Sequence, residues 1–496
     1  MKLAEFGDLL PVPEECRTLE IRDLSNDSRE VKPGALFFAV PGYKTDGLRY
    51  LGDAIAKGAV AAVIEGPGPP DSTIPLLQVT DVRVMEGLVA ARFFGNPSRR
   101  LRMIGVTGTN GKTTVTHLIQ HILTAAAIPT GLIGTVRVQH GSQIYPAERT
   151  TPDAIELQRL LAEMIAGGMK AVVMEVSSHA LALHRVNGTE YDVAVLTNIT
   201  HDHFDFHQDS HSYLEAKSLL FRNLGSGGKP QKYAVLNRED SNSERFAQRC
   251  AAPVYYYGIN QQAQVRLADV VRKGSRSQLT VELFGEKCRF PTALPGQFNQ
   301  YNIMAAITVA YLEGVPLATI AAAVPKFPGV PGRYQEVSCG QPFRVMVDFA
   351  HNPAALENIL QMAKEQSGGR RIIVFGCEGE KDRLKRPLMG KIAAENAEVS
   401  ILTADNLYHE EINQIFADVL RDLPEAERRA IIVEPDRRAA IRKAVELARP
   451  GDFLIVAGKG HEQYLVRGSE QEPFNDVEVL REILADQAEA TPWYPV

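Results

Sequence analysis

A short glycine-rich segment carries the most specific chemistry in the sequence. It is Gly108-Thr109-Asn110-Gly111-Lys112-Thr113-Thr114. Glycines let the backbone approach phosphate oxygens, Lys112 can place a positive charge on the terminal phosphates, and Thr113 or Thr114 can offer a hydroxyl to Mg²⁺. The spacing departs from the usual phosphate loop, because Val106 stands where a glycine is common. The segment predicts binding of a nucleoside triphosphate, and a glycine turn with an incidental lysine is the alternative.

Two polar groups further along the chain could hold the metal that accompanies such phosphates. Glu175 ends an apolar stretch, and the cluster His201-Asp202-His203-Phe204-Asp205 follows the next one. Oxygen and imidazole ligands suit a cation that neutralises phosphates. A zinc site or a solvated loop is the alternative, but neither a histidine pair at helical spacing nor a cysteine accompanies the cluster. The pattern therefore favours Mg²⁺ bound together with phosphates.

Apolar runs and turn residues indicate the elements that must position these groups. Residues 101–106 are typical of a strand and residues 113–127 of a helix, so the glycine-rich segment lies between them. That arrangement aims backbone N–H groups at a phosphate. Residues 171–176 and 192–198 are apolar without alternation, which is typical of buried parallel strands. The polar groups are expected at the carboxyl ends of these strands.

The whole chain is expected to be an α/β protein of three domains. Its 496 residues are too many for one ordinary hydrophobic core. Proline- and glycine-rich joints at residues 94–100 and 327–333 separate three segments. The first has an α/β pattern on a small scale, and the third has repeated strand-then-helix units typical of an open doubly wound sheet. We place the domains at residues 1–97, 98–329 and 330–496.

Composition excludes several classes of function. A net charge of -6 gives no basic face for nucleic acid. Five cysteines without CxxC spacing argue against a disulfide framework and favour a reducing cytoplasm. No run reaches the roughly 18 apolar residues that a membrane span needs. We expect a cytoplasmic protein whose partners are small molecules, and the oligomeric state stays open, with a monomer as one option.

Several motifs occur in an order that resembles the central ATPase domain of the Mur ligase family. They are Thr109-Asn110-Gly111-Lys112-Thr113-Thr114, Glu175-Val176-Ser177-Ser178-His179, Thr197-Asn198 with Asp202-His203, and Tyr213-Leu214-Glu215-Ala216-Lys217. The resemblance extends from Asp27 to about Glu478. It implies a small α/β UDP-binding domain, a central P-loop ATPase domain with a mainly parallel sheet, and a C-terminal Rossmann-like domain that binds an amino acid.

Motifs in the outer domains are similar to the family members that add the third amino acid to UDP-MurNAc-dipeptide. They are Asn26-Asp27-Ser28-Arg29 with Lys32-Pro33-Gly34, Gly42-Tyr43-Lys44-Thr45-Asp46-Gly47, Gly376-Cys377 through Asp382, Lys385-Arg386-Pro387-Leu388-Met389-Gly390, and Gly458-Lys459-Gly460-His461-Glu462. The resemblance implies an ATP- and Mg²⁺-dependent ligase of peptidoglycan synthesis. Its substrates would be UDP-MurNAc-L-Ala-D-Glu, activated as an acyl phosphate, and a free diamino acid.

The resemblance also implies roles for individual residues. The expected catalytic residues are Lys112, Lys217, His203 and His351, and either histidine could accept the proton of the attacking amine. The expected ATP-binding residues are Gly108, Thr109, Asn110, Gly111, Lys112, Thr113, Thr114, Asn302, Arg333 and Asp348. The expected metal ligands are Thr114, Glu175, His203 and Lys217, the last in carbamylated form.

Two further sets of residues are implied for the other substrates. Those expected to bind the UDP-MurNAc-peptide are Asn26, Ser28, Tyr43, Lys44, Thr45, Asp46, Thr150, Thr151, Ser177 and Arg185. Those expected to bind the amino acid are Lys381, Asp405, Asn406, Tyr408, Gly458 and Glu462. One peptide contact departs from the pattern, because Leu183 stands where these enzymes often have a glutamine.

The amino-acid position departs from the family pattern at two residues. Members that add meso-diaminopimelate typically carry Asp-Asn-Pro-Arg, whereas this chain has Asp405-Asn406-Leu407-Tyr408 and has Lys381 in place of a second arginine. Tyrosine lacks the charge, and lysine lacks the planar fork that grips a carboxylate. The chain could therefore add lysine or ornithine, or it could add diaminopimelate through a rearranged clamp.

Two other interpretations stay open. The segment Phe349-Ala350-His351-Asn352-Pro353 is similar to folylpolyglutamate and cyanophycin synthetases, which favours a paralogue acting on another carboxylate acceptor. A nucleotide-binding regulator without ligase activity is the last alternative. The presence of Lys217, Glu175 and His203 together argues against a regulator, since a switch has no need for two metal sites.

Overall fold

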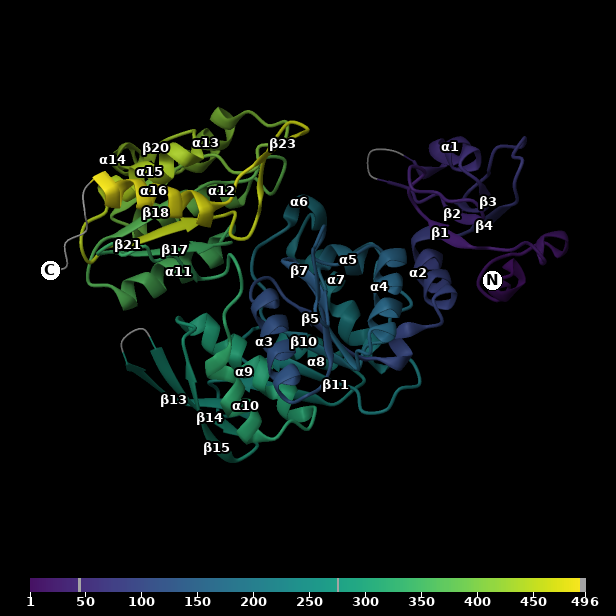
Figure 1. The fold of residues 1–496 in the computed structure, drawn as a ribbon, viewed down its shortest axis with the longest axis horizontal. Helices are drawn as coiled ribbons and strands as arrows, with labels where there is room; N and C mark the ends of the chain where they lie inside the picture. The colour runs from purple at the N-terminus through teal and green to yellow at the C-terminus, as the bar shows by residue number, and fades with distance from the viewer. Residues whose placement is uncertain (43–45, 274–275, 491–496) are drawn as a thin grey trace.

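The computed structural model describes residues 1–42, 46–273 and 276–490, which form three lobes, each on its own sheet (Figure 1). The N-terminal and C-terminal lobes lie on either side of the central lobe. This arrangement confirms the predicted three-domain α/β architecture. The boundaries at residues 97/98 and 329/330 stay predictions. Three residues expected to bind UDP, namely Tyr43, Lys44 and Thr45, lie outside the described residues.

The N-terminal lobe is a parallel sheet of four strands in sequence order. The strands are β1 (Asp23–Ser25), β2 (Ala35–Phe38), β3 (Ala59–Glu65) and β4 (Leu76–Val79). The helices are α1 (Leu51–Ala56) and α2 (Val82–Phe93). Strand β2 is buried on both faces because apolar clusters form on each side of this small sheet.

The central lobe contains an eleven-stranded sheet whose middle is parallel. In spatial order the parallel strands are β13 (Val265–Lys273), β12 (Val254–Gly258), β11 (Tyr233–Asn237), β10 (Val193–Leu196), β5 (Arg102–Thr107), β9 (Ala171–Glu175) and β6 (Thr130–Ile133). Antiparallel strands extend both edges, namely β14 (Arg276–Leu283) and β15 (Glu286–Thr292) on one side and β7 (Arg137–His140) and β8 (Gln143–Pro146) on the other.

Helices cover both faces of the central sheet, which explains its unbroken apolar strands. The face that includes Ile104 packs against α3 (Lys112–Ala125), α9 (Gln297–Leu312) and α10 (Leu317–Ala323). The face that includes Met103 packs against α4 (Ala154–Ala166) and α7 (Ser210–Arg222). Three short helices complete the lobe, α5 (Ser178–Ala182), α6 (Phe204–His207) and α8 (Ser243–Gln248).

The C-terminal lobe has the predicted doubly wound sheet. Its strands, in spatial order, are β16 (Gln335–Glu336), β17 (Arg344–Asp348), β21 (Phe453–Ala457), β18 (Arg371–Phe375), β19 (Val399–Leu402) and β20 (Ile432–Val433), of which only β16 is antiparallel to its neighbour. One face packs against α11 (Pro353–Gln366), α12 (Lys385–Asn396) and α13 (Ile412–Leu420), and the other against α15 (Arg437–Leu447) and α16 (Asp476–Ala490). Outside the sheet lie α14 (Glu425–Ala430) and the hairpin of β22 (Tyr464–Arg467) and β23 (Glu470–Pro473).

Two expectations from composition can be compared with the fold. Among the described residues no helix is long and apolar enough to cross a membrane. All five cysteines are free, which agrees with the expectation that no disulfide framework holds the chain together.

Candidate active site

The glycine-rich segment forms the turn between β5 and α3, as the sequence predicts. Gly111 adopts a φ of +88°, and a Cβ at this position would overlap the side chain of Asn302. Gly108 has a φ of +142°, and a Cβ there would overlap Thr197. Only glycine allows both the backbone conformation and the close approach. Helix α3 begins at Lys112, so its unpaired N–H groups face the same turn.

The turn is braced by the end of the neighbouring strand β10. The backbone N–H of Thr109 donates to the carbonyl of Asn198 (2.7 Å), and that of Asn110 donates to the Asn198 side-chain oxygen (3.1 Å). The hydroxyl of Thr197 donates to the carbonyl of Asn110 (2.6 Å). These bonds fix the loop before any ligand binds, and this role of Thr197 and Asn198 was not predicted from the sequence.

Lys112 lies folded against its own loop. Its Nζ donates to the carbonyls of Gly108 (3.0 Å) and Thr109 (2.8 Å). Burial lowers the pKa of this ammonium, although the carboxylates of Glu175 and Asp202 oppose the shift. The side chain is therefore held at the turn, where an anionic ligand would further stabilise its charge.

Glu175 and Thr113 supply oxygen donors next to the phosphate turn. Glu175 is fully buried at the end of β9 and accepts hydrogen bonds from the hydroxyls of Thr113 (3.0 Å) and Thr135 (3.1 Å). Within the described ranges, no group of three or more histidine, cysteine, aspartate or glutamate side chains is placed to hold a metal. A few hard oxygen donors beside a phosphate site fit a Mg²⁺ ion that would be held by the protein together with the phosphates of a bound nucleotide.

Lys217 projects from α7 into the same region and is 1% exposed. Its Nζ donates to the carbonyl of Gly108 (2.8 Å) and lies 4.6 Å from the centroid of the Tyr213 ring. Burial, assisted by the charge of Lys112, lowers the pKa of Lys217 well below its usual value. This environment favours the neutral amine, which is the form that reacts with carbon dioxide.

Two cavities meet at the phosphate turn, each of about 260 Å³. Both are lined by Asn110, Gly111, Thr114 and Arg333. The first cavity, which we call the nucleotide cavity, continues past Asn302 and Asp348. The second, which we call the acceptor cavity, runs from the phosphate turn to the loops of the C-terminal lobe and is lined by Lys112, Thr150, Glu175, His203, His351, Lys381 and Tyr408, among others. A group transferred at the shared turn could pass from one cavity to the other.

The nucleotide cavity joins the central and C-terminal lobes. Arg333 reaches from the C-terminal lobe to the hydroxyl of Thr113 (3.4 Å), and its guanidinium lies 4.3 Å from the ring centroid of Phe349. Asp348 accepts a hydrogen bond from the backbone of Tyr334 (2.7 Å), and burial raises the pKa of Asp348 against the opposing charge of Arg333. Phe298 and Tyr334 also line this cavity, and neither was predicted as a site residue from the sequence.

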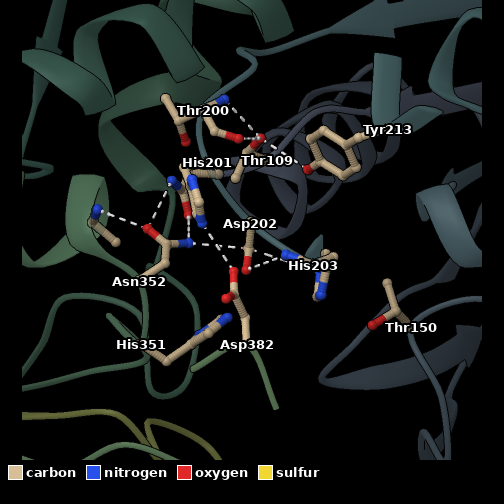
Figure 2. A network of polar contacts seen from close by, with 12 residues as sticks. Thr109, Thr150, Thr200, His201, Asp202, His203, Tyr213, His351, Asn352 and Asp382 are labelled. Carbon is tan, nitrogen blue, oxygen red and sulfur yellow. Dashed lines mark hydrogen bonds and ion pairs between the residues drawn. The ribbon is translucent and has the colours of Figure 1, made fainter. Parts of the chain in front are cut away.

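A polar network connects the same two lobes beside the acceptor cavity (Figure 2). The amide of Asn352 donates to Asn110 (3.1 Å) and to Asp202 (3.2 Å). A second link joins His201 to Asp382 (3.0 Å). These contacts hold the C-terminal lobe against the phosphate turn, so residues of both lobes border one cavity.

The two histidines expected to act as bases both line the acceptor cavity. Burial lowers the pKa of His351 to about 4, and its Nδ1 lies 2.8 Å from the carbonyl of Phe349. Burial also lowers the pKa of His203 well below its usual value, although Asp202 opposes the shift. Both imidazoles are neutral near pH 7 and can accept a proton. His179, whose ring centroid lies 4.8 Å from that of His203, is a further lining residue that had no predicted role.

Residues expected to bind the UDP-MurNAc-peptide lie in two places. Thr150 lines the acceptor cavity, and Thr151 lies behind it, donating to the carbonyl of Glu175 (2.8 Å). Ser177 caps α5, and Arg185 pairs with Asp153 (3.0 Å).

The remaining residues of this set belong to the N-terminal lobe. Asn26 donates to the buried Glu86 (2.7 Å), Ser28 is 8% exposed, and Asp46 accepts from the backbone of Leu48 (3.0 Å). The charge of Arg185 acts on Glu86, which places Glu86 and its partner Asn26 at the side of the N-terminal lobe that faces the central lobe. None of Asn26, Ser28 and Asp46 lines the acceptor cavity as described.

Residues expected to bind the amino acid lie at the end of the acceptor cavity that the C-terminal lobe lines. Tyr408 and Lys381 line it, with the ammonium 5.6 Å from the ring centroid. Behind them, Asn406 donates to Glu462 (2.9 Å), and Asp405 lies against Gly458, where a Cβ would come within 2.6 Å of a carboxylate oxygen. The lining also includes Glu378, Asp382 and Lys385, for which sequence reasoning gave no role although all three fall within quoted motifs.

Three protein-family models match the chain in order. "Mur ligase family, catalytic domain" matches residues 20–93. "Mur ligase middle domain" matches residues 106–310, and "Mur ligase, glutamate ligase domain" matches residues 332–460. Together they span each of the three lobes.

Similar proteins cover nearly the full length. The UDP-N-acetylmuramoyl-L-alanyl-D-glutamate–2,6-diaminopimelate ligase of Solibacter usitatus is 41% identical over 474 residues, covering 96% of this chain and 95% of that protein. The ligase of the same name from Bacillus cereus is 40% identical and covers 96% of each chain. A solved structure of such a ligase is 30% identical with a TM-score of 0.69, covering 98% of this chain and 99% of the other. A folylpolyglutamate synthase from Mycobacterium tuberculosis complexed with ADP, 18% identical with a TM-score of 0.63 over 76% of this chain and 91% of its own, shares the fold alone.

Proposed function

Because the chain belongs to the Mur ligase family, we propose that it is an ATP-dependent ligase that joins a diamino acid to UDP-MurNAc-L-Ala-D-Glu. One observation supports this most directly: the nucleotide and acceptor cavities share the phosphate turn at Asn110, Gly111, Thr114 and Arg333. The named relatives add diaminopimelate, and this amino acid is the first candidate for the present chain.

The first step transfers the γ-phosphoryl group of ATP to the acceptor carboxylate. A carboxylate oxygen forms a bond to phosphorus while the bond to the leaving ADP oxygen breaks, which gives an acyl phosphate and ADP. Lys112, the N–H groups at the start of α3 and Arg333 surround the shared turn and stabilise the negative charge of the transferring group. No side-chain nucleophile is required.

The second step forms the amide bond. The amine of the incoming amino acid attacks the acyl carbon, the carbon–nitrogen bond forms, and inorganic phosphate leaves. The proton lost by the amine goes to His351, or to His203 where that imidazole does not hold a metal ion, and burial lowers the pKa values of both histidines. The links from Asn352 and His201 that join the lobes help to exclude water from the acyl phosphate.

Mg²⁺ would neutralise phosphate charge at the shared turn when bound. The hydroxyl of Thr114 and the carboxylate of Glu175 would hold one ion, and His203 and a carbamylated Lys217 would hold another. The burial of Lys217 supports the modification, because carbon dioxide reacts with a neutral amine and the site favours that form.

The alternative acceptors receive less support. The folylpolyglutamate synthase structure covers 76% of this chain at 18% identity, whereas the diaminopimelate ligases cover nearly all of it at about 40% identity. A regulator without activity would have no use for a second cavity joined to the nucleotide cavity. A cytoplasmic location remains a prediction from the sequence.

The proposed function is tested by measuring phosphate release from ATP. Purified protein is incubated with Mg²⁺, UDP-MurNAc-L-Ala-D-Glu and diaminopimelate, lysine or ornithine in separate reactions, and products are identified by mass spectrometry. A tripeptide product with one of these amino acids is the expected result. Absence of product with all three would contradict the UDP-MurNAc-dipeptide assignment and direct the search to other carboxylate acceptors.

A further inference from the structure

Glu378 presents a carboxylate without a partner to the acceptor cavity. It lies three residues beyond the end of β18, in the loop that leads to α12, and lines the cavity together with Lys381, Tyr408 and His203. In the part of the chain that the structure describes, no hydrogen bond or ion pair reaches this carboxylate, whereas the backbone carbonyl of Glu378 accepts from Arg386 (3.1 Å). The loop is thus anchored through its backbone, and the side chain is left for a ligand.

Backbone contacts hold Glu378 against the segment expected to bind the amino acid. The N–H of Gly379 donates to the carbonyl of Asn406 (2.8 Å), and a Cβ on Gly379 would overlap the carbonyl of Leu407. The two loops touch at residues adjacent to Glu378. Its carboxylate therefore lies at the end of the cavity that the C-terminal lobe lines. Two other carboxylates in this region, those of Asp405 and Glu462, act electrostatically on Glu378.

The charges around Glu378 are incompletely balanced. One carboxylate oxygen of Asp405 is buried without a hydrogen-bond partner, and Asp405 is 3% exposed. Glu462, in contrast, is paired with Lys459 (2.6 Å). Burial, together with the charge of Asp405, raises the pKa of Glu378 to about 7. A cation bound at this point would offset both effects and stabilise the ionised carboxylate.

A second buried charge without a contact lines the same cavity. Lys385 is 3% exposed, and among the described residues no hydrogen bond or ion pair reaches its Nζ. Its charge acts on Glu378, yet the two side chains do not come within the 4.0 Å of an ion pair. A buried cation and a carboxylate that line one cavity without touching suit a ligand that carries both an anionic and a cationic group.

We propose that Glu378 is a specificity-determining residue that receives the side-chain ammonium of the incoming amino acid. This inference rests on the proposed function and names the chemistry that selects the amino acid: a second amino group at the far end of the side chain. Tyr408, whose ring centroid lies 5.6 Å from the ammonium of Lys381, lines the same cavity as Glu378. The site should therefore prefer a diamino acid over an analogue that lacks only the distal amine.

The test compares Glu378→Gln with wild type on matched pairs of amino acids. The pairs are meso-diaminopimelate with 2-aminopimelate, and L-lysine with L-norleucine. Loss of a charge-assisted hydrogen bond should raise KM for the preferred diamino acid about 10- to 100-fold, with KM for its matched analogue and for ATP unchanged. The control is Glu380→Gln, because Glu380 is an exposed carboxylate of the same loop that pairs with His409 and does not line the cavity. The control should behave like wild type.

The pH dependence gives a second readout. The carboxylate binds the ammonium only when ionised, so in wild type the preference for the diamino acid over its analogue should increase as the pH rises through about 7. Glu378→Gln should lose this dependence. The charged groups that face Glu378 are Asp405, Glu462, Lys381 and Lys385, and both variants keep all four.

The outcomes separate this inference from the proposed function. An equal loss of kcat for a diamino acid and its analogue would mean that Glu378 acts on the attacking amine, and it would overturn the assignment. Unchanged KM values in Glu378→Gln would overturn it as well. If wild type forms no product with any amino acid, the proposed function fails. Calorimetric binding of meso-diaminopimelate and 2-aminopimelate to wild type and to Glu378→Gln then decides the role of Glu378.

Discussion

The two ends of the acceptor cavity are built from different kinds of groups. At the phosphate end, the turn at Gly108 and Gly111 is braced by Asn198, and Lys112 is bonded to the turn itself. The other end is lined by loops of the C-terminal lobe and is expected to bind the amino acid, so we call it the amino-acid end. There, within the described residues, no hydrogen bond reaches the charged groups of Glu378 and Lys385. A phosphate is the same in every turnover, so a rigid backbone cradle suits it. The amino-acid end selects by charge, and its side chains are completed by the ligand.

Removing the cation of the phosphate end should have the largest effect. Lys112→Ala is expected to lower kcat on the order of 1,000-fold, because the transferring phosphoryl group loses its nearest fixed positive charge. The measurement is steady-state phosphate release with the amino acid that gives product. Thermal unfolding serves as the control and should show little loss, because burial already disfavours this ammonium. A fall in kcat smaller than 10-fold would show that the N–H groups and Arg333 suffice.

Lys217 tests whether the phosphate end depends on a modified side chain. Lys217→Arg keeps a positive charge but cannot form a carbamate, so kcat should fall on the order of 100-fold. Wild type should also lose activity in buffer depleted of carbon dioxide and recover it when bicarbonate is added. Full activity of Lys217→Arg would exclude a required carbamate and leave the bond to Gly108 as the role of this lysine.

Asn352 joins the two ends and should have an intermediate effect. Asn352→Ser keeps a side chain that caps α11 but is too short to reach Asp202 and Asn110. We expect kcat/KM to fall about 10-fold with a nearly unchanged melting temperature, since the hydrogen bonds that join Asn352 to Asn110 and Asp202 are lost. Asn396→Ser is the matched control, because this half-buried amide accepts from Gln361, donates to the carbonyl of Ile392 and does not line the cavity. An unchanged kcat/KM would show that the network does not hold the catalytic arrangement.

The smallest effect concerns the pH dependence of the free energy of unfolding, which His117 of α3 is expected to change. Burial lowers the pKa of His117 to about 4, and its Nε2 is buried without a partner. A histidine with a depressed folded pKa takes up its proton only on unfolding, so it destabilises the protein as the pH falls from about 6.5 towards about 4. His117→Asn should reduce the loss of unfolding free energy between pH 7 and pH 5 by about 2 kcal/mol. The exposed His211→Asn should not change that loss, and equal curves for wild type and His117→Asn would contradict the prediction.

Local patterns were sufficient to predict the fold and the phosphate end. The strand at residues 101–106 and the helix at residues 113–127 match β5 and α3 to within two residues at each end. The segment between them is a phosphate turn because glycine backbone geometry and strand-turn-helix order are local properties. The parallel strands that end at Glu175 and Leu196 were predicted for the same reason, since burial on both faces leaves an unbroken apolar run.

The amino-acid end was predicted only in part. Lys381 and Tyr408 were identified through resemblance to a family motif, and both line the cavity. Glu378 and Lys385 fall within quoted motifs, but their types alone gave no reason to single them out. A glutamate in a loop is usually solvated, and its partners can be known only once the loops after β18 and β19 are placed side by side.

The sequence by itself determined the three-part α/β fold, the phosphate turn and the residue types available for catalysis, because these depend on short-range periodicity and backbone geometry. The tertiary structure alone decided which charges lack partners and which lobes share a cavity. Asn352 lies 242 positions from Asn110 along the chain, yet the two side chains are 3.1 Å apart. The pKa shift of Glu378 likewise arises from burial and from Asp405, and both are properties of packing between distant segments.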